Sequence, residues 1–336
     1  MKTNAAKQNN FSKSMILAAV MLTIFAMAFQ PGEAKAGMKS PPPEKIKVII
    51  IGDRVVDIAY NLGVLPEAMS VRGSLWSMAK QLKTVSQILG CPNCTIVKKK
   101  ETIPNALTQR GIKRVIVEKS DVFCLYKPKI KLENIAVIMA GMDVKIEYVD
   151  FSQGLESAVR QTAKLLDRES KADKVIEKYK KKLARVKAKL PKEKLGKKVI
   201  IFSGTYQPST GKSTLRVEAP YGYADHFLLD PLGCLNVGDS FKPADGKANK
   251  GHYPVRKKKN GMVLDPVIKA NPDVIVMTGD ALAVQRAFAD YLTANPAFAQ
   301  VKAIRNMAVY ALPAYVDSSV LEYPDILKKW AVALAR

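Results

Sequence analysis

Histidine is scarce in this chain: His226 and His252 are the only two among 336 residues. Receptors for bare zinc or manganese usually supply several histidines together with carboxylates, so two histidines argue against such a site. If the chain handles a metal, its composition favours one that arrives already chelated. Neither a Ser/His/Asp set nor a carboxylate pair of catalytic spacing can be identified, so hydrolase chemistry has no positive support.

Acidic residues are few as well, 30 against 54 lysines and arginines, which gives a net charge of +24. Such an excess favours anionic partners: acidic ligands, lipid headgroups or nucleic acid. The sequence has no recognition helix, zinc finger or aromatic RNA-binding motif, so we do not expect nucleic acid as a partner. Many lysines stand in short runs, as at Lys98 to Lys100 and Lys180 to Lys182, and we interpret them as solvated surface.

Only one apolar run stands out, at 15–29, and three lysines precede it. Small residues follow at Ala34-Lys35-Ala36. This order predicts a secretory signal peptide over residues 1–36 and a periplasmic protein. The alternative is an uncleaved membrane anchor, but the run is shorter than the roughly 20 residues that span a bilayer. A linker over 37–45, with Pro41-Pro42-Pro43, is expected to follow.

Short β-branched runs alternate with helical patterns over the rest of the chain. They predict buried strands, which are expected at 47–51, 68–71, 113–118, 145–149, 198–202, 273–277 and 308–312. Strands that alternate with helices indicate βαβ units and parallel sheets. We therefore predict an α/β protein with an N-terminal lobe over 46–155 and a C-terminal lobe over 191–336.

Residues 156–190 between these lobes carry a long helical pattern that ends at Pro191. Ile176, Leu183 and Leu190 belong to a narrow apolar stripe on a surface that is otherwise covered by lysine and glutamate. Such a helix is too long for a loop and too polar for a core. We predict one long α-helix that bridges two Rossmann-like lobes, with the ligand between them.

Four segments of the second half carry a family resemblance, at 201–213, 228–237, 264–276 and 295–313. In this order around a central helix they resemble the substrate-binding proteins of iron-siderophore, haem and vitamin B12 importers. The resemblance extends loosely to residue 47. It implies a monomeric periplasmic solute-binding protein, not an enzyme, with no intrinsic cofactor. Such a protein delivers a metal chelate (siderophore, haem or corrinoid) to an ABC permease in the inner membrane.

The resemblance also implies that one acid in each lobe docks against arginines of the permease. These acids fall on Glu101 and Asp265, although the family usually has glutamate at both positions. The alternative is that both acids only stabilise the N-termini of the helices that they open.

Ligands of open parallel sheets lie beyond the carboxyl ends of the strands. The loops there supply the candidate ligand-binding residues, which are Arg72, Trp76, Cys124, Tyr126, Tyr206, Lys212 and Tyr315. Trp76 could equally pack beneath a helix predicted at 75–89. Although Gly211-Lys212-Ser213 resembles a phosphate-binding loop, Tyr206 stands where that motif needs glycine, so nucleotide binding is not expected.

His252 and Tyr253 are further candidates, in a Gly/Lys/Pro-rich loop expected over 240–260. They could contact a haem-like or corrinoid ligand, or lie exposed in a flexible loop. His226 is expected in the core rather than at a ligand, because its predicted helix is apolar.

Four cysteines, Cys91, Cys94, Cys124 and Cys234, allow three complete disulfide pairings, and the sequence does not choose among them. Cys91-Pro92-Asn93-Cys94 has three interpretations: a local disulfide, a metal or soft-ligand site, or a redox-active pair. A periplasmic thiol oxidoreductase or a metal-binding protein that uses Cys91 and Cys94 is thus the alternative function. The residues after Cys94 are expected to be extended, which disfavours an oxidoreductase, because thioredoxin-like enzymes place such a pair where a helix begins.

Overall fold

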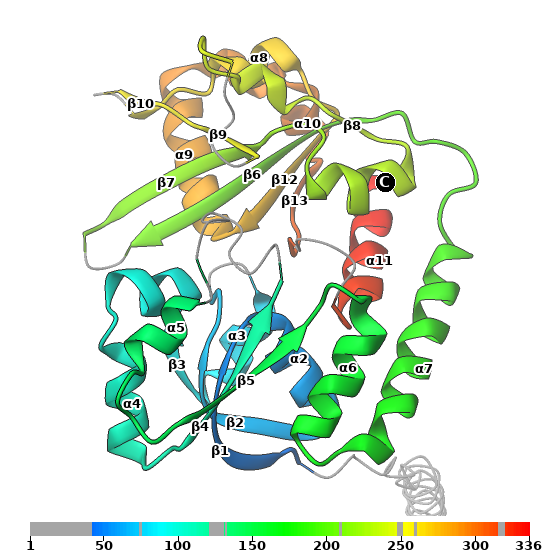
Figure 1. Ribbon diagram of the computed structural model, residues 1–336. Coiled ribbons are helices and arrows are strands. Elements are labelled where there is room, and N and C mark those ends of the chain that lie inside the picture. The colour runs from blue at the N-terminus through cyan, green and yellow to red at the C-terminus, as the bar shows by residue number, and fades with distance from the viewer. Residues whose placement is uncertain are drawn as a thin grey trace, which may run out of the picture. The chain divides into compact units, whose positions relative to one another are not determined.

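The computed structural model describes residues 42–73, 76–120, 131, 133–207, 210–246, 251–258, 261–314 and 320–336. The predicted signal peptide lies outside these residues, as do Cys124, Tyr126 and Tyr315. In the described part of the chain, no helix is both long and apolar enough to cross a membrane. Two main β-sheets organise this part (Figure 1).

Sheet A has five strands in the order β3-β2-β1-β4-β5, and every pair in it is parallel. The strands are β1 (Glu44–Ile51), β2 (Val64–Ser70), β3 (Gln87–Gly90), β4 (Arg114–Lys119) and β5 (Lys145–Asp150). The chain builds the sheet outward from β1 on one side and from β4 on the other. The switch point of this half, where open sheets of this kind bind ligands, therefore lies between β1 and β4.

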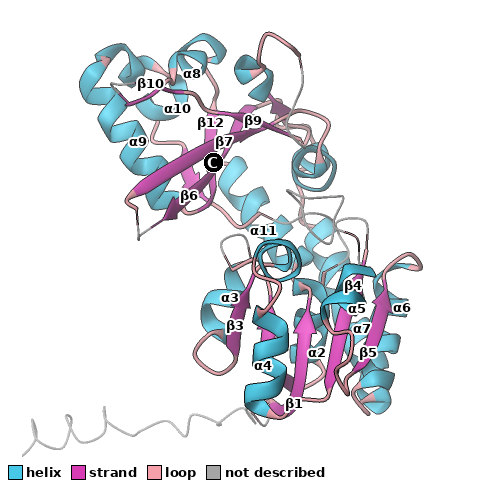
Figure 2. Ribbon diagram, turned by 60° about the vertical axis from the view of Figure 1, so that its left-hand side comes forward, coloured by secondary structure: helices cyan, strands magenta, loops and turns pink. Residues whose placement is uncertain are grey.

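Helices cover both faces of sheet A (Figure 2). Those of this half are α2 (Asp53–Asn61), α3 (Ser77–Leu82), the π-helix η1 (Cys94–Lys98), α4 (Thr102–Arg110) and α5 (Glu133–Ile138). Val48 and Ile50 of β1 lie in one hydrophobic cluster with α2, whereas Ile49 and Ile51 lie in another with α4 and α5. This alternation follows from the two-residue period of a strand that is buried on both sides.

The helix predicted at 75–89 is wrong in its second half. Helix α3 ends at Leu82, and β3 follows it as the edge strand of sheet A. Ile88 and Leu89 fit the helical spacing, but a short apolar run fits a strand equally well, and Ile88 pairs with Met69 of β2.

Sheet B is mixed rather than parallel, which corrects the prediction for the second half. Its order is β13-β12-β6-β7-β9, with β8 beside β6. The strands are β6 (Lys198–Gln207), β7 (Lys212–Glu218), β8 (Leu235–Asn236), β9 (His252–Pro254), β12 (Val274–Gly279) and β13 (Val309–Ala311). β12 is parallel to β6 and β13, but β7 is antiparallel to β6 and β9. The cause is that β7 runs back along β6 as an antiparallel partner, where a loop was expected.

The remaining elements of the second half are short, apart from two helices. They are η2 (Asp225–Leu229), η3 (Asp230–Leu232), η4 (Gly238–Phe241), β10 (Lys257–Lys258), β11 (Gly261–Met262), α8 (Asp265–Ala270), α9 (Ala281–Ala294), η5 (Pro296–Gln300), α10 (Lys302–Arg305) and α11 (Tyr323–Leu334). β10 and β11 form a separate two-stranded sheet.

Between β5 and β6 in the sequence, the chain forms two helices, α6 (Gly154–Leu165) and α7 (Glu169–Lys187). One long helix over 156–190 was predicted there. The helical pattern is interrupted at Asp167, which has a φ of 54°. Aspartate tolerates this left-handed conformation better than most residues, and a helix cannot continue through it. Helix α7 packs against α6 and α11, and Lys182 of α7 pairs with Asp325 of α11.

One hydrophobic cluster includes residues of both sheets. It contains Val48 and Ile50 of sheet A, Val199 and Ile201 of sheet B, and the apolar side of α11. Trp330 of α11 is fully buried in this cluster, and its indole Nε1 donates to the carbonyl of Pro313 at 2.7 Å. Helix α11 thus belongs to a core that both sheets share.

Candidate functional site

The carboxyl ends of the sheet A strands bring charged and sulfur-bearing residues to one edge. Asp53 follows β1, Arg72 follows β2, Cys91 follows β3, and Glu118 lies near the end of β4. Ligand sites of parallel sheets lie at this edge, so it is the first candidate site.

Asp53, Arg54, Arg72 and Glu118 form what we call the β1–β4 charge cluster, and none is more than 5% exposed. The Arg72 Nε lies 2.5 Å from Asp53 Oδ2, and the Arg72 backbone N–H donates to Asp53 Oδ1 at 2.8 Å. The Arg54 Nε lies 3.4 Å from Glu118 Oε1, and its backbone N–H donates to Glu118 Oε2 at 3.2 Å. Two arginines and two acids therefore balance one another at the switch point.

Gly52 makes this arrangement possible. Its φ is +123°, and a Cβ built on it would lie 2.3 Å from the Cβ of Glu118. Only glycine lets the chain turn from β1 into α2 directly under the Glu118 side chain. Burial raises the pKa of Glu118, while Arg54 and Arg72 oppose that shift.

Arg72 was predicted to bind ligand, and the structure places it at the predicted edge. Its buried side chain is bonded to Asp53, so it ties β2 to the start of α2. The contacts of Arg72 thus show a structural role, and its contact with a ligand stays a prediction.

Trp76 is 1% exposed, which favours the alternative of core packing over ligand stacking. Its indole Nε1 donates to Glu322 Oε2 at 3.2 Å. Nearby, the fully buried Asp57 accepts from the Leu321 backbone N–H at 3.0 Å and from Asn61 at 3.1 Å. These contacts join α2 and the chain before α3 to the start of α11.

Asp57 and Glu322 are two acids that the sequence analysis missed. Burial raises the pKa of Asp57 well above its ordinary value, and the charge of Glu322 raises it further. Burial likewise raises the pKa of Glu322 to about 7, against a hydrogen bond from Trp76 that lowers it. The sequence does contain one indication of this buried acid: Asp57 stands between Val56 and Ile58 on an apolar helix.

The carboxyl end of sheet B is a hairpin that extends past its neighbours. Strand β6 pairs with β12 only as far as Gly204, whereas Gln207 still pairs with Lys212 of β7. Tyr206 is half-buried, and the Arg286 guanidinium lies 5.3 Å from the centroid of its ring. A flat aromatic or anionic group could be held by such a pair.

Tyr206 and Lys212 were predicted to line one site, and they do lie in one hairpin. Tyr206 pairs directly with Ser213, and Lys212 pairs with Gln207. Because directly opposite residues share a face and successive residues alternate, Tyr206 and Lys212 belong to opposite faces of the hairpin. The hairpin therefore presents Tyr206 together with Ser213 on one face and the exposed Lys212 on the other.

His252 and Tyr253 lie on strand β9, where a loop was expected, and both are buried. The imidazole Nε2 of His252 lies 2.7 Å from Glu218 Oε1, and Tyr253 donates to Asp239 at 2.6 Å. They pair with the final residues of β7, away from the hairpin end of β6. These positions do not favour contact with a ligand at the carboxyl edge. His226, expected in the core, has an exposed side chain.

Cys91 and Cys94 are both half-buried, with their sulfurs 2.9 Å apart. The extended segment expected after Cys94 is wrong, because Thr95 to Val97 belong to η1. Cys234 is buried in the other half of the chain, where burial raises the pKa of its thiol. Among the described residues, no group of three or more His, Cys, Asp or Glu side chains could hold a metal ion.

Glu101 and Asp265 are both exposed at the starts of α4 and α8. Neither start has a hydrogen bond from a capping side chain. If these acids stabilise the helix N-termini, they therefore do so through their charge and not through a capping hydrogen bond. Both residues are exposed to solvent.

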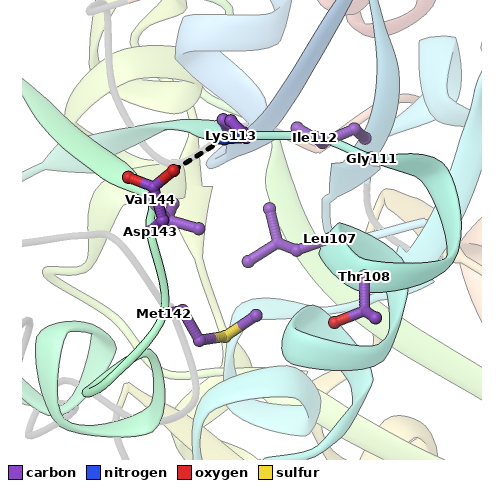
Figure 3. A pocket seen from close by; sticks show the side chains of 8 residues that line it. All are labelled: Leu107, Thr108, Gly111, Ile112, Lys113, Met142, Asp143 and Val144. Atoms are coloured by element: carbon purple, nitrogen blue, oxygen red, sulfur yellow. Dashed lines mark hydrogen bonds and ion pairs between the residues drawn. The ribbon is translucent and has the colours of Figure 1, made fainter.

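A shallow pocket of about 220 Å³ lies at the opposite edge of sheet A (Figure 3). It is lined by Leu107, Thr108, Gly111, Ile112, Lys113, Met142, Asp143 and Val144. Lys113 and Asp143 form an exposed ion pair of 2.6 Å at its rim. Because these residues precede β4 and β5, the pocket lies at the amino ends of the strands and not at the candidate site.

Comparison with known proteins agrees with this architecture. Residues 110–216 match the family model described as periplasmic binding protein. No curated protein matches the sequence. The periplasmic haem-binding protein RhuT from Roseiflexus sp. RS-1 has a similar fold, with a TM-score of 0.61 and 14% identity over 87% of this chain and 98% of that one.

Two further solved structures give the same result. The periplasmic haem-binding protein HutB of Vibrio cholerae has a TM-score of 0.54 and 16% identity, over 86% of this chain and 98% of that chain. FeuA from Bacillus subtilis, complexed with ferri-bacillibactin, has a TM-score of 0.53 and 19% identity, over 86% of this chain and 92% of that chain. The chain therefore has the two-lobed fold of these periplasmic binding proteins, and the family model that matches residues 110–216 agrees with the resemblance found in its motifs.

Proposed function

We propose that this protein is a periplasmic solute-binding protein that captures a metal chelate and delivers it to an ABC importer. Its fold is that of haem- and siderophore-binding proteins over 86–87% of the chain, and this observation carries the proposal. Haem and ferric siderophores are the favoured ligands, and a corrinoid is less specifically supported. The chelate is cargo, so the proposal needs no resident cofactor.

The alternative of a thiol oxidoreductase is not supported, because the proteins with this fold are described as binding proteins. The helical segment after Cys94 removes one argument against that alternative, but it supplies no positive one.

We place the ligand at the carboxyl edges of the two sheets. The Tyr206 hairpin and the end of sheet A supply aromatic, cationic and sulfur-bearing groups there, and these groups suit a large, flat or anionic chelate. The direct test is native mass spectrometry and absorbance spectroscopy of the protein purified from its host. A co-purifying haem or ferric siderophore supports the proposal, whereas a protein that binds neither in titrations contradicts it.

Substitution of Tyr206 tests the sheet B side of this site. We expect Tyr206→Ala to raise the Kd for the chelate about 2- to 30-fold, because the aromatic face is lost and Arg286 no longer has the ring that holds it. Fluorescence titration measures the change. Tyr221→Ala is the matched control, since Tyr221 is 97% exposed beyond the other end of β7. An equal effect of both substitutions would count against a ligand at the hairpin.

Charge reversal tests the docking acids separately from ligand binding. We expect the double variant Glu101→Lys/Asp265→Lys to lower uptake at least about tenfold, because like charges brought together cost several kcal/mol. Its Kd for the chelate should equal that of the parent protein. Transport into proteoliposomes that contain the cognate permease measures uptake, with the exposed Glu133→Lys as control. Unchanged uptake would remove Glu101 and Asp265 from the interface.

A further inference from the structure

The two cysteines at the end of β3 are placed to react with each other. Their sulfurs lie 2.9 Å apart, and the backbone N–H of Cys94 donates to the carbonyl of Cys91 at 2.8 Å. One helical turn thus brings the side chains together. Both residues are half-buried rather than enclosed in the core.

A metal site is the weaker interpretation of this pair. In the described part of the chain, no third His, Cys, Asp or Glu joins Cys91 and Cys94 in a possible metal-binding group. Soft metal ions in proteins are usually held by three or four such ligands. A disulfide needs only the two sulfurs that the structure brings together.

We propose that Cys91 and Cys94 are a thiol–disulfide modification site, oxidised by exchange with a disulfide-bearing oxidant after export. The two thiols lose two protons and two electrons as their sulfur–sulfur bond forms. The disulfide of the oxidant accepts both and is released as two thiols. The proposal rests on the export that is part of the proposed function, because oxidation requires an oxidising compartment.

Contacts around the pair connect it to the candidate ligand edge. The Ser70 hydroxyl donates to the Gly90 carbonyl at 3.1 Å and lies 2.9 Å from the Thr95 hydroxyl. Val71 donates its backbone N–H to the same Gly90 carbonyl at 2.9 Å. The turn that holds both sulfurs is therefore bonded to the end of β2, next to Arg72. A disulfide in this turn stiffens the segment that is hydrogen-bonded to the end of β2 at the carboxyl edge of sheet A.

Peptide mapping of the exported protein tests the bond itself. Trypsin releases residues 84–98 as one peptide that contains both cysteines, since no other lysine or arginine lies inside it. After alkylation in denaturant without reductant, we expect this peptide unlabelled and lighter by two hydrogens. After reduction it should take two labels. Two labels without reductant, or a cross-link from this peptide to Cys124 or Cys234, would overturn the proposal.

Thermal unfolding supplies the second measurement. We expect reduction to lower the Tm of the parent protein by about 2–4 °C, because a short covalent loop is opened. The double variant Cys91→Ser/Cys94→Ser should lose this response, and the buried Cys234→Ser should keep it. A response that survives in the double variant contradicts the proposal. Neither readout uses a ligand, so a failure here is distinct from a failure to bind chelate.

Discussion

Replacing Glu118 by alanine is expected to lower the free energy of unfolding by about 3–5 kcal/mol, as is usual when one partner of a buried ion pair is removed. Glu118 is 1% exposed and accepts from the Arg54 backbone and from Ser120. Its loss leaves the positive charge of Arg54 in a site where water cannot replace the carboxylate. Urea unfolding followed by circular dichroism measures the change.

A comparison with Glu101→Ala separates this effect from a general loss of negative charge. Glu101 is exposed, and its substitution should change the free energy by less than about 0.5 kcal/mol. A double variant that replaces both Glu118 and Arg54 by leucine should recover part of the loss, because no unpaired charge remains. A cost for Glu118→Ala no larger than for Glu101→Ala would show that the charge cluster does not stabilise the switch point.

Rising pH is expected to destabilise the protein between about pH 4.5 and 7 through Glu322. Its pKa is raised from 4.5 to about 7 in the folded protein, so the folded state keeps a proton that the unfolded chain has already lost. Stability from this group is complete below pH 4.5 and is lost as the pH approaches 7. The loss is about 2–3 kcal/mol, and the raised pKa of Asp57 acts in the same direction.

Glu322→Gln tests the origin of this pH dependence. Glutamine cannot ionise, yet its amide oxygen can still accept from the indole of Trp76. The parent protein should have a lower free energy of unfolding at about pH 8 than at about pH 5. In Glu322→Gln, most of this difference should be absent. Exposed Glu133→Gln should behave like the parent. If Glu322→Gln and the parent show the same difference between the two pH values, the buried carboxyl is not its source.

The general architecture could be predicted from the sequence because the buried strands are strongly patterned. The run at 48–51 is apolar and β-branched, and it forms the end of β1. The hairpin strand β7 was missed, although Leu215 and Val217 are buried and alternate with more exposed residues. The signal is short, because only Leu215 and Val217 carry it and the preceding residues Gly211, Lys212 and Ser213 are typical of a loop.

The candidate site was harder to predict than the fold. The position of Arg72 follows from the end of the strand predicted at 68–71, whereas Cys91 reaches the same edge through β3, which was predicted as helix. The pairing of Arg54 with Glu118 depends on which strands are neighbours, and local sequence does not fix that order. His252 illustrates the converse error: a segment rich in glycine and lysine looked like an open loop, but one strand within it carries the histidine into the core.

The core that sheets A and B share with α11 limits how far the two halves can move apart. A wide swing of one half away from the other would expose Ile326, Leu327 and Trp330 to water, at about 1.5–3 kcal/mol for each side chain. Small sliding adjustments of packed helices avoid that cost. Under the proposed function, we therefore expect the chelate to meet a largely preformed surface. Its release would then require contacts with the permease that separate the two halves, because the shared core opposes their spontaneous separation.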